Sequence, residues 1–440
     1  MLSKGKKQII ALFILSFFIK VFVAMFSLLF FNWETIPPFP WDQLIIGTLE
    51  PYLDYKLSYT NFVQAFIHED WFPYISEVSD PILASYVYPP LFLYALTLPG
   101  LINMDLVFLP LLLSDILSPL IIYFLLIHSH GEKIARWGFV AIAFCPFSIF
   151  YNSGLLFNMS IVIFFFTLSL YLIYIKRLKW ATFTLAISFL IKQIILFLII
   201  PIFIYIILKS TEDKQTSIVT HTIILLGTLF IGSLPWILIA PNKYVTTLLM
   251  GQQITLTPIF SSPALTWPLH WYSFLIELKV PYWALYITGF LNFTAFGLMM
   301  LQLTNIILLL YWDSKDSLEW PKFLCLITYN ALLNHLFLPR GVYKYYFTLH
   351  VPLIVLWICF NFTPSFSSTS WRKKALILFL AISLLFLLIH RFFYLWLVWI
   401  IFFSMLIHNL GNRIFGNRKF VFKKTRDGTN EENDKFKVTN

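Results

Sequence analysis

Long apolar runs recur along the whole chain, and they limit its possible folds more than any other feature. The hydrocarbon core of a bilayer is about 30 Å thick, so a spanning helix needs about 20 apolar residues. The runs do not alternate apolar and polar residues as the strands of a membrane barrel do, which favours helices. The predicted spans are residues 8 to 32, 88 to 103, 106 to 127, 137 to 151, 159 to 175, 179 to 191, 194 to 208, 219 to 240, 282 to 311, 323 to 338, 346 to 362, 375 to 389 and 392 to 410.

Composition excludes a water-soluble fold. Of the 440 residues, 59% are hydrophobic and 12% are charged, whereas an ordinary soluble domain has about 25% charged residues. The sequence therefore predicts an all-α, polytopic membrane protein with about 12 to 14 transmembrane helices. Residues 1–422 form the predicted membrane domain, and the polar residues 423–440 are predicted to be a disordered cytoplasmic tail.

Basic residues in the short connections predict how the chain is oriented, because cytoplasmic loops carry an excess of Lys and Arg. The first run follows a group of lysines and lacks a cleavage site after it, so we interpret it as a retained anchor. The first external loop (residues 32–87), a second external segment (241–281) and residues 339–345 then lie on the non-cytoplasmic face. The connections assigned to the cytoplasm contain Lys176, Arg177, Lys179, Lys209, Lys214, Lys315, Lys322, Arg372, Lys373, Lys374 and Arg413.

The predicted number of membrane crossings is inconsistent in one part of this topology. Three apolar runs between residues 88 and 151 have to fit an even number of crossings, so one of them is expected to be re-entrant or interrupted. The chain is predicted to be a multi-pass protein of the cell membrane in a prokaryote or of the endoplasmic reticulum membrane in a eukaryote. Its functional site is predicted to lie on the external or lumenal face.

Several classes of function are excluded. The net charge of +10 does not indicate binding of nucleic acid, because the basic residues adjoin the span ends, where the headgroups of membrane lipids are the nearer partners. Cys145, Cys325 and Cys359 lie in apolar runs without metal-ligand spacing. The motifs GxSxG, HExxH, GxGxxG and Walker A are absent from the sequence. We predict no cofactor, and the sequence gives no support for a divalent metal.

The first external loop combines acids with aromatic residues, and a loop of this length is usually functional. Asp54 opens the stretch DYKLSYTNFVQAFIHEDWFPY, in which apolar and aromatic residues recur at helical spacing. A short interfacial helix is therefore predicted to hold the Asp54 carboxylate near the membrane surface. For the other acids of the loop, a solvated surface anchored by aromatic residues is the alternative interpretation.

Charged residues inside the apolar runs are further candidates. Asp115 lies in LLLSDILSPL, where an acid costs about 3 kcal/mol or more and faces either substrate or a neighbouring helix. Lys192 and Gln193 divide AISFLIKQIILFLIIP into two short halves, which predicts a hairpin whose lysine either binds a phosphate or snorkels to the surface. Arg340 and Lys344, in LPRGVYKYYF, place positive charge on the non-cytoplasmic side, which indicates an anionic partner.

Taken in order, these segments resemble a family of membrane enzymes. One N-terminal span is followed by a long external loop, by PYISEVSD and YVYPPLFLY, by an acid in a following span, and then by FCPFSIFYNSGLLFN and SFLIKQIILFLIIPIFIYIIL. This order resembles the GT-C glycosyltransferases whose donor is a polyprenyl-phosphate sugar. The Lys-Gln hairpin is similar to that of the dolichyl-phosphate-glucose glucosyltransferases, and RGVYKYYFTLHVPL is similar to the GPI, mycobacterial and archaeal mannosyltransferases.

The resemblance implies transfer of a hexose, with mannose favoured, from a polyprenyl- or dolichyl-phosphate sugar donor to a lipid-linked or membrane-bound glycan acceptor. In that family an external-loop aspartate is the general base, which by motif position is Asp54, and Asp70 is the implied second acid that orients acceptor hydroxyls. The substrate-binding residues that the matched segments imply are Tyr88, Asp115, Lys192, Gln193, Arg340, Lys344 and Tyr345.

The chain also departs from the family pattern. Many relatives carry an acid after the Pro of the fourth apolar run, whereas residues 152–158 here read Asn-Ser-Gly-Leu-Leu-Phe-Asn. The late His-Glu-Lys of the eukaryotic glucosyltransferases has no counterpart, which favours a mannosyl or other hexosyl group. Two other classes stay open: a flippase or transporter of lipid-linked sugars, and a non-catalytic subunit with the same fold. Concentration of the polar residues on one external face favours an enzyme.

Overall fold

The computed structural model describes residues 4–30, 55–69, 71–73, 86, 88–250, 281, 295–337, 343–361, 369–389 and 391–415. The described chain is entirely helical and contains 16 α-helices, so the predicted all-α class is confirmed. The α-helices are α1 (Lys4–Phe30), α3 (Thr60–His68), α5 (Pro90–Gly100), α6 (Leu109–His130), α7 (Glu132–Ala143), α8 (Pro146–Ser148), α9 (Met159–Tyr174), α10 (Leu178–Ile191), α11 (Leu196–Lys209), α12 (Lys214–Ile239), α13 (Pro241–Met250), α16 (Ala295–Ser314), α17 (Trp320–Phe337), α18 (His350–Asn361), α19 (Thr369–Leu388) and α20 (Arg391–Phe415).

Short helices of other types join several of these elements. Two are π-helical, η1 (Tyr55–Tyr59) and η3 (Ile149–Gly154), and three are 3₁₀ helices, η2 (Met104–Leu106), η4 (Gln193–Ile195) and η5 (Lys344–Leu349). Every apolar run singled out in the sequence overlaps one of the helices. The apolar runs therefore predicted the elements well, and the finer question is which of them cross a membrane.

Three helical segments of the described chain are long and apolar enough to cross a bilayer: Gly5–Leu29, Met104–His130 and Lys214–Ile239. A fourth candidate is a bent pair, Glu132–Ala143 with Pro146–Gly154, whose axes differ by 40°. These segments identify a membrane protein. Other apolar helices are shorter, and α10 and α11 contain 14 residues each, which at 1.5 Å per residue is about 21 Å.

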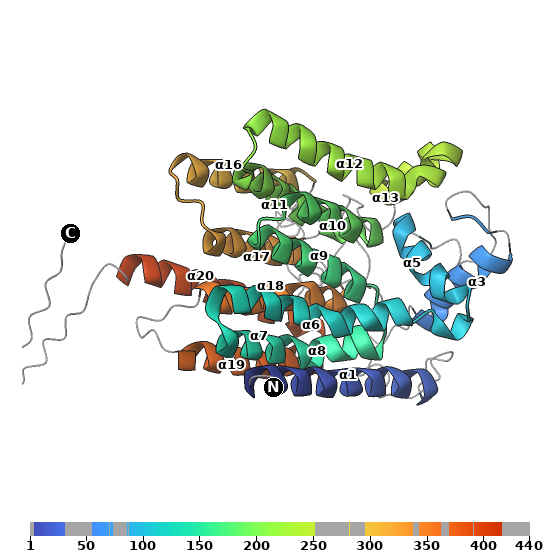
Figure 1. The fold of residues 1–440 in the computed structure, drawn as a ribbon, viewed down its shortest axis with the longest axis horizontal. Coiled ribbons are helices and arrows are strands. Elements are labelled where there is room, and N and C mark those ends of the chain that lie inside the picture. The colour runs from blue at the N-terminus through green and yellow to red at the C-terminus, as the bar shows by residue number, and fades with distance from the viewer. Residues whose placement is uncertain are drawn as a thin grey trace, which may run out of the picture.

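The long helices lie beside one another in a layered bundle (Figure 1). Helix α12 occupies one edge and α1 the opposite edge, and α10, α9 and α6 pack in sequence between them. The bundle has two ends. One end holds the α9–α10, α11–α12 and α16–α17 connections. Ion pairs join the segments at this end, one between Lys179 and Glu212 (2.9 Å) and one between Lys214 and Asp313 (3.6 Å). The opposite end carries α3, α5 and α13, and we call it the α3 end.

Helix α5 is formed by the first of the three apolar runs between residues 88 and 151. It has only 11 residues, and its two ends lie against η1 and α3. At its start the Phe92 ring meets the Tyr59 ring at 4.8 Å between centroids. At its end a Cβ on Gly100 would lie 2.8 Å from Val63 Cγ1. Helix α5 thus packs along η1 and α3 at this end of the bundle, and its length is about half of what a spanning helix needs.

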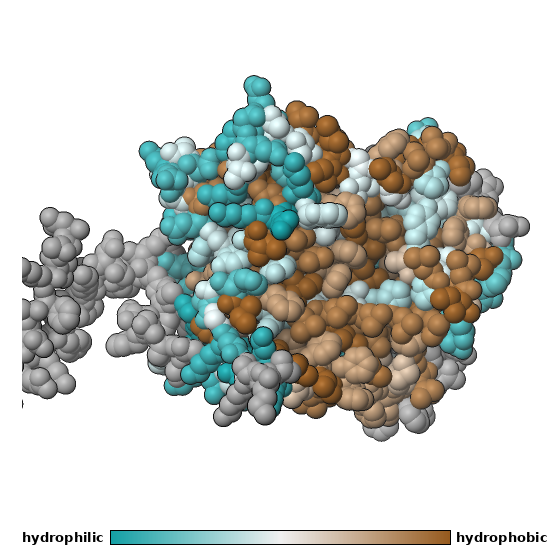
Figure 2. All heavy atoms as spheres, in the orientation of Figure 1, coloured by the Kyte–Doolittle hydropathy of each residue, from teal (hydrophilic) through white to brown (hydrophobic). Residues whose placement is uncertain are grey.

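The outer surface of the bundle suits a lipid environment. Figure 2 shows hydrophilic residues gathered at the end opposite α3 and hydrophobic residues over most of the remaining surface in view. Outward-facing residues of the two edge helices are large and apolar, including Phe18 (63% exposed) and Phe22 (68%) on α1, and Ile223 (65%) and Ile231 (72%) on α12. Exposed apolar surface of this extent marks a membrane-facing wall.

Candidate functional site at Lys192

The apolar hairpin formed by α10 and α11 is interrupted at Lys192. This residue ends α10 in an extended conformation (φ −158°, ψ 129°), and η4 follows before α11 begins at Leu196. Its side chain is fully buried, with 0% of the residue exposed. Burying an ammonium costs free energy unless hydrogen bonds or opposite charges compensate it, so the groups around Lys192 define the chemistry of the site.

Three segments that are far apart in the sequence supply those neighbours. The Lys192 ammonium donates to Asn158 Oδ1 (2.9 Å) and to the Tyr345 hydroxyl (3.3 Å). It also lies over three aromatic rings, at 4.7 Å from the centroid of Tyr346, 4.9 Å from Tyr345 and 5.6 Å from Tyr88. The negative faces of these rings stabilise the cation where water is excluded. We call these five residues the Lys192 cage.

Aromatic packing holds the cage in place. Phe157 stacks on the Tyr345 ring with 4.0 Å between centroids and 5° between planes. On the other side, Tyr88 packs against Phe92 (4.9 Å) and Tyr59 (5.9 Å), which links the cage to η1 and α5. The double proline explains the position of Tyr88, because Pro89 is extended (φ −59°, ψ 156°) and Pro90 opens α5.

The hydrogen-bonding chemistry of Asn158 shows what the cage lacks. A lysine ammonium can only donate, so the Asn158 amide has to turn its oxygen toward Lys192. Its Nδ2 group is consequently directed elsewhere, and it is buried without a hydrogen-bond partner among the residues that the structure describes. The cage therefore combines a buried cation with a buried donor that has no acceptor, an arrangement suited to an oxyanion.

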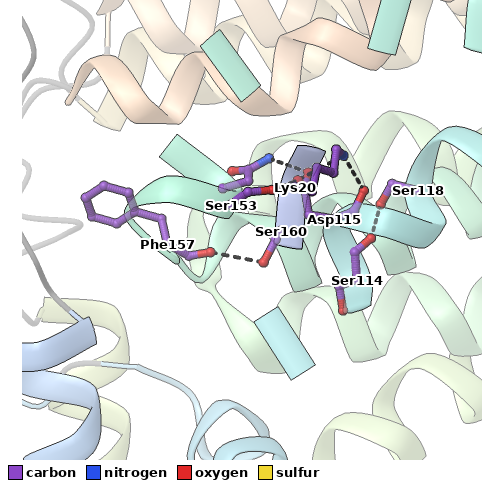
Figure 3. A network of polar contacts seen from close by, with 8 residues as sticks. Lys20, Ser114, Asp115, Ser118, Ser153, Phe157 and Ser160 are labelled. Atoms are coloured by element: carbon purple, nitrogen blue, oxygen red, sulfur yellow. Dashed lines mark hydrogen bonds and ion pairs between the residues drawn. The ribbon is translucent and has the colours of Figure 1, made fainter. Parts of the chain in front are cut away.

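Asp115 belongs to a different network, shown in Figure 3. Its carboxylate forms an ion pair with Lys20 of α1 (2.9 Å) and accepts hydrogen bonds from Asn152 Nδ2 (3.2 Å) and Ser153 Oγ (2.6 Å) of η3. Lys20 also donates to the Asp115 carbonyl oxygen (2.7 Å). Of the two roles that the sequence left open for Asp115, the contacts are those of a bridge between α1, α6 and η3.

Lys344 and Gln193 occupy distinct positions around the cage. The Lys344 ammonium donates to the carbonyl oxygens of Leu387 (3.2 Å) and Ile389 (2.9 Å) at the end of α19. A cation at this position stabilises the C-terminus of a helix. The same ammonium lies over the Tyr394 ring, 5.8 Å from its centroid. Gln193 follows Lys192 directly and is 2% exposed. Of the predicted substrate-binding residues, Tyr345 and Tyr88 both lie against the Lys192 ammonium.

Three predicted site residues, Asp54, Asp70 and Arg340, lie outside the described residues, as do most of residues 241–281 and the tail 423–440. The helix predicted to follow Asp54 is present as η1 and α3. Among the described residues there is no group of three or more His, Cys, Asp or Glu side chains placed to hold a metal ion.

Three residues that make these contacts were not predicted as site residues from the sequence: Lys20, Asn158 and Tyr346. The contact of Lys20 with Asp115 could have been predicted from the sequence. Lys20 is a lone cation in the first apolar run and Asp115 is a lone acid in another, and such charges pair inside membranes. Asn158 and Tyr346 are ordinary polar and aromatic residues next to motifs already singled out. Only the fold brings them to Lys192.

The cage contains three hydrogen-bond donors, namely one ammonium, one amide and the hydroxyl of Tyr345, and such donors are the chemistry by which proteins recognise a phosphate. Neither a scan against protein-family models nor a search of the curated proteins finds a match to the chain. The function is therefore inferred from the chemistry of the site, from the helical membrane fold and from the order of the sequence segments.

Proposed function

We propose that the chain is a membrane glycosyltransferase of GT-C type, with about 12 to 14 spans when the shorter apolar helices are counted. It transfers a hexose, with mannose favoured, from a polyprenyl- or dolichyl-phosphate sugar to a lipid-linked glycan or glycolipid. The reaction takes place on the non-cytoplasmic face. The observation that carries the proposal is the Lys192 cage, in which a buried cation and a buried unpartnered amide donor meet at the break of an apolar hairpin.

Depth in the membrane supports a lipid-borne donor. Helices α10 and α11 have 14 residues each, so the hairpin is about 9 Å shorter than a hydrocarbon core of about 30 Å. With its other end at the basic connections, its tip at Lys192 stops inside the bilayer on the α3 side. A phosphate attached to a long apolar chain can approach from the lipid, whereas a soluble nucleotide sugar lacks such an anchor.

The proposed reaction requires a base and a cation. Asp54 removes the proton of the acceptor hydroxyl as the hydroxyl oxygen attacks the anomeric carbon of the donor sugar. The bond between that carbon and the phosphate oxygen breaks, and polyprenyl phosphate leaves with the bonding electrons. Lys192, the Asn158 amide and the Tyr345 hydroxyl stabilise the negative charge that accumulates on the leaving phosphate. Arg340 is assigned to the same phosphate on the resemblance alone.

The decisive experiment uses purified full-length protein in detergent with radiolabelled polyprenyl-phosphate mannose or glucose and a pool of lipid-linked oligosaccharides. The unaltered protein is expected to transfer label, with mannose preferred. Lys192→Met should lower the transfer rate by about 100-fold or more, and Lys192→Arg should retain more activity because the charge remains. Asp54→Asn should lower the rate by about 10²- to 10⁴-fold.

Matched controls separate chemistry from folding. Asp105→Asn changes an exposed acid of η2 at the same end of the bundle, and it should leave transfer unchanged. A folded Asp54→Asn protein with full transfer would refute the assigned base. Movement of the intact lipid-linked sugar across vesicles without transfer would support a flippase instead, and absence of both activities from the folded protein would indicate a non-catalytic subunit.

A further inference from the structure

The end of the bundle opposite α3 contains a cavity of about 300 Å³. It lies between the α9–α10 and α11–α12 connections, at the end where hydrophilic residues gather in Figure 2. We call it the basic pocket, and it is lined by Lys176, Arg177, Leu178, Lys179, Trp180, Lys209, Ser210, Thr211, Glu212 and His221. Glu212 is the one acid in this lining, against four basic residues.

The charges of the pocket are only partly compensated. Glu212 binds Lys179 at 2.9 Å. In the part of the chain that the structure describes, no ion pair joins Lys176, Arg177 or Lys209 to an acid. Three like charges around one cavity repel one another, and an anion bound between them would remove that repulsion.

The backbone of the α9–α10 turn fixes two of these basic residues, Lys176 and Arg177. Lys176 adopts a left-handed conformation (φ 61°), which reverses the chain immediately after α9. The Arg177 amide then donates to the Leu172 carbonyl oxygen at 2.8 Å, which closes the turn. Such a conformation is uncommon for a residue with a side chain, so the turn is a defined feature of the fold.

The surroundings of the pocket distinguish a lipid from a soluble anion. Trp180 on its rim is 61% exposed, and tryptophan is enriched where a membrane meets water. Helix α12 begins beside the pocket and exposes Ile218 (48%), Val219 (56%) and Ile223 (65%) along its first turns. An anionic headgroup in the cavity would thus have an apolar wall beside it for its acyl chains.

We propose that the basic pocket binds the headgroup of an anionic phospholipid, with the phosphate against Lys176, Arg177 and Lys209. Glu212 favours a headgroup that carries hydroxyl groups, because its buried Oε2 atom has no hydrogen-bond partner among the described residues and can accept from one. Phosphatidylglycerol has this chemistry. The pocket lies at the opposite end from the Lys192 cage, so the inference does not depend on the proposed glycosyltransferase activity.

The test measures lipid binding to the full-length protein in detergent by native mass spectrometry, with phosphatidylglycerol, phosphatidylcholine and soluble glycerol phosphate as probes. Phosphatidylglycerol is expected to bind in preference to both other probes. The double variant Arg177→Gln/Lys209→Gln should bind it roughly 30-fold more weakly, because each basic residue near an anionic lipid contributes a factor of about five.

The matched control is Lys373→Gln/Lys374→Gln. These lysines lie outside the pocket lining, over the rings of Trp137 (4.5 Å) and Trp371 (4.7 Å), and their loss should leave phosphatidylglycerol binding unchanged. Equal weakening in both double variants, equal binding of phosphatidylcholine, or equal binding of glycerol phosphate would each overturn the proposal. Should the first double variant not fold, the single variant Lys209→Gln decides, with an expected weakening of about fivefold.

Discussion

At the scale of single residues, Tyr345 has two separable contacts with Lys192, one through its hydroxyl (3.3 Å) and one through its ring (4.9 Å). Tyr345→Phe should lower the free energy of unfolding by only about 1 kcal/mol, because one long hydrogen bond is lost. Tyr345→Leu should cost about 2 kcal/mol more, because the stack on Phe157 and the cation–π contact are lost as well. Reversible unfolding in detergent measures both values, and equal losses would mean that the ring does not hold the cation.

The pair formed by Lys20 and Asp115 allows a second measurement. Either Lys20→Met or Asp115→Leu should lower the free energy of unfolding by about 3–5 kcal/mol, because each leaves one buried charge without its partner. The double variant should be less destabilised than the sum of the two by at least about 2 kcal/mol. Additive losses would show that the ion pair contributes no coupling, and that Asn152 and Ser153 compensate the carboxylate alone.

The two buried lysines show how far the sequence could predict individual residues. Both Lys20 and Lys192 interrupt apolar runs, and both positions require compensation. Lys192 could be singled out from the sequence, because Gln193 and two short apolar halves accompany it. The sequence could not show that Asn158 and Tyr346 surround this ammonium, or that Asp115 pairs with Lys20, since those contacts join segments far apart in the chain.

At the scale of helices, Gly138 of α7 and Gly227 of α12 lie in opposite surroundings. A Cβ on Gly138 would lie 2.2 Å from Leu126 Cδ1 of α6, whereas one on Gly227 would meet nothing within 4 Å. Gly138→Ala should therefore lower the free energy of unfolding by about 1–3 kcal/mol. Gly227→Ala should raise it by about 0.5–1 kcal/mol, because alanine favours the helix. Thermal unfolding in detergent compares the two, and stabilisation by Gly138→Ala would contradict the close packing of α6 and α7.

Helix positions were more predictable than helix roles. Apolar runs identify α5 and α10 as readily as they identify α12, because all three are uninterrupted apolar sequence. Helix α5 contacts Tyr59 and Val63, which the apolar pattern does not connect to it. The role of a short apolar helix therefore depends on tertiary packing that the sequence alone does not show.

At the scale of the whole molecule, the two ends of the bundle should face opposite sides of the membrane. Ile102 is 80% exposed after α5, and Thr211 lies in the basic pocket. In intact cells, or for a eukaryotic chain in opened organelles, Ile102→Cys should react with a membrane-impermeant maleimide from the non-cytoplasmic side. Thr211→Cys should react only from the cytoplasmic side.

The unaltered protein is the blank for this labelling, because Cys145 and Cys359 are buried and Cys325 is half-buried against Asn409. Reaction of both new cysteines from one side would contradict the two-ended arrangement. The orientation is a prediction from the basic connections of the sequence. That these connections meet at one end of the bundle is a property of the packed helices.

The short hairpin of α10 and α11 also affects the bilayer around it. Under the proposed function, a donor phosphate reaches Lys192 only by sinking below the plane of the neighbouring headgroups, or by meeting a leaflet that has thinned at the hairpin. Each added ångström of hydrocarbon thickness lengthens the distance that the phosphate has to sink and raises the free energy that this requires. Membrane thickness thereby becomes a control on the reaction, so that sterol-rich, thicker membranes slow sugar transfer and thinner ones favour it.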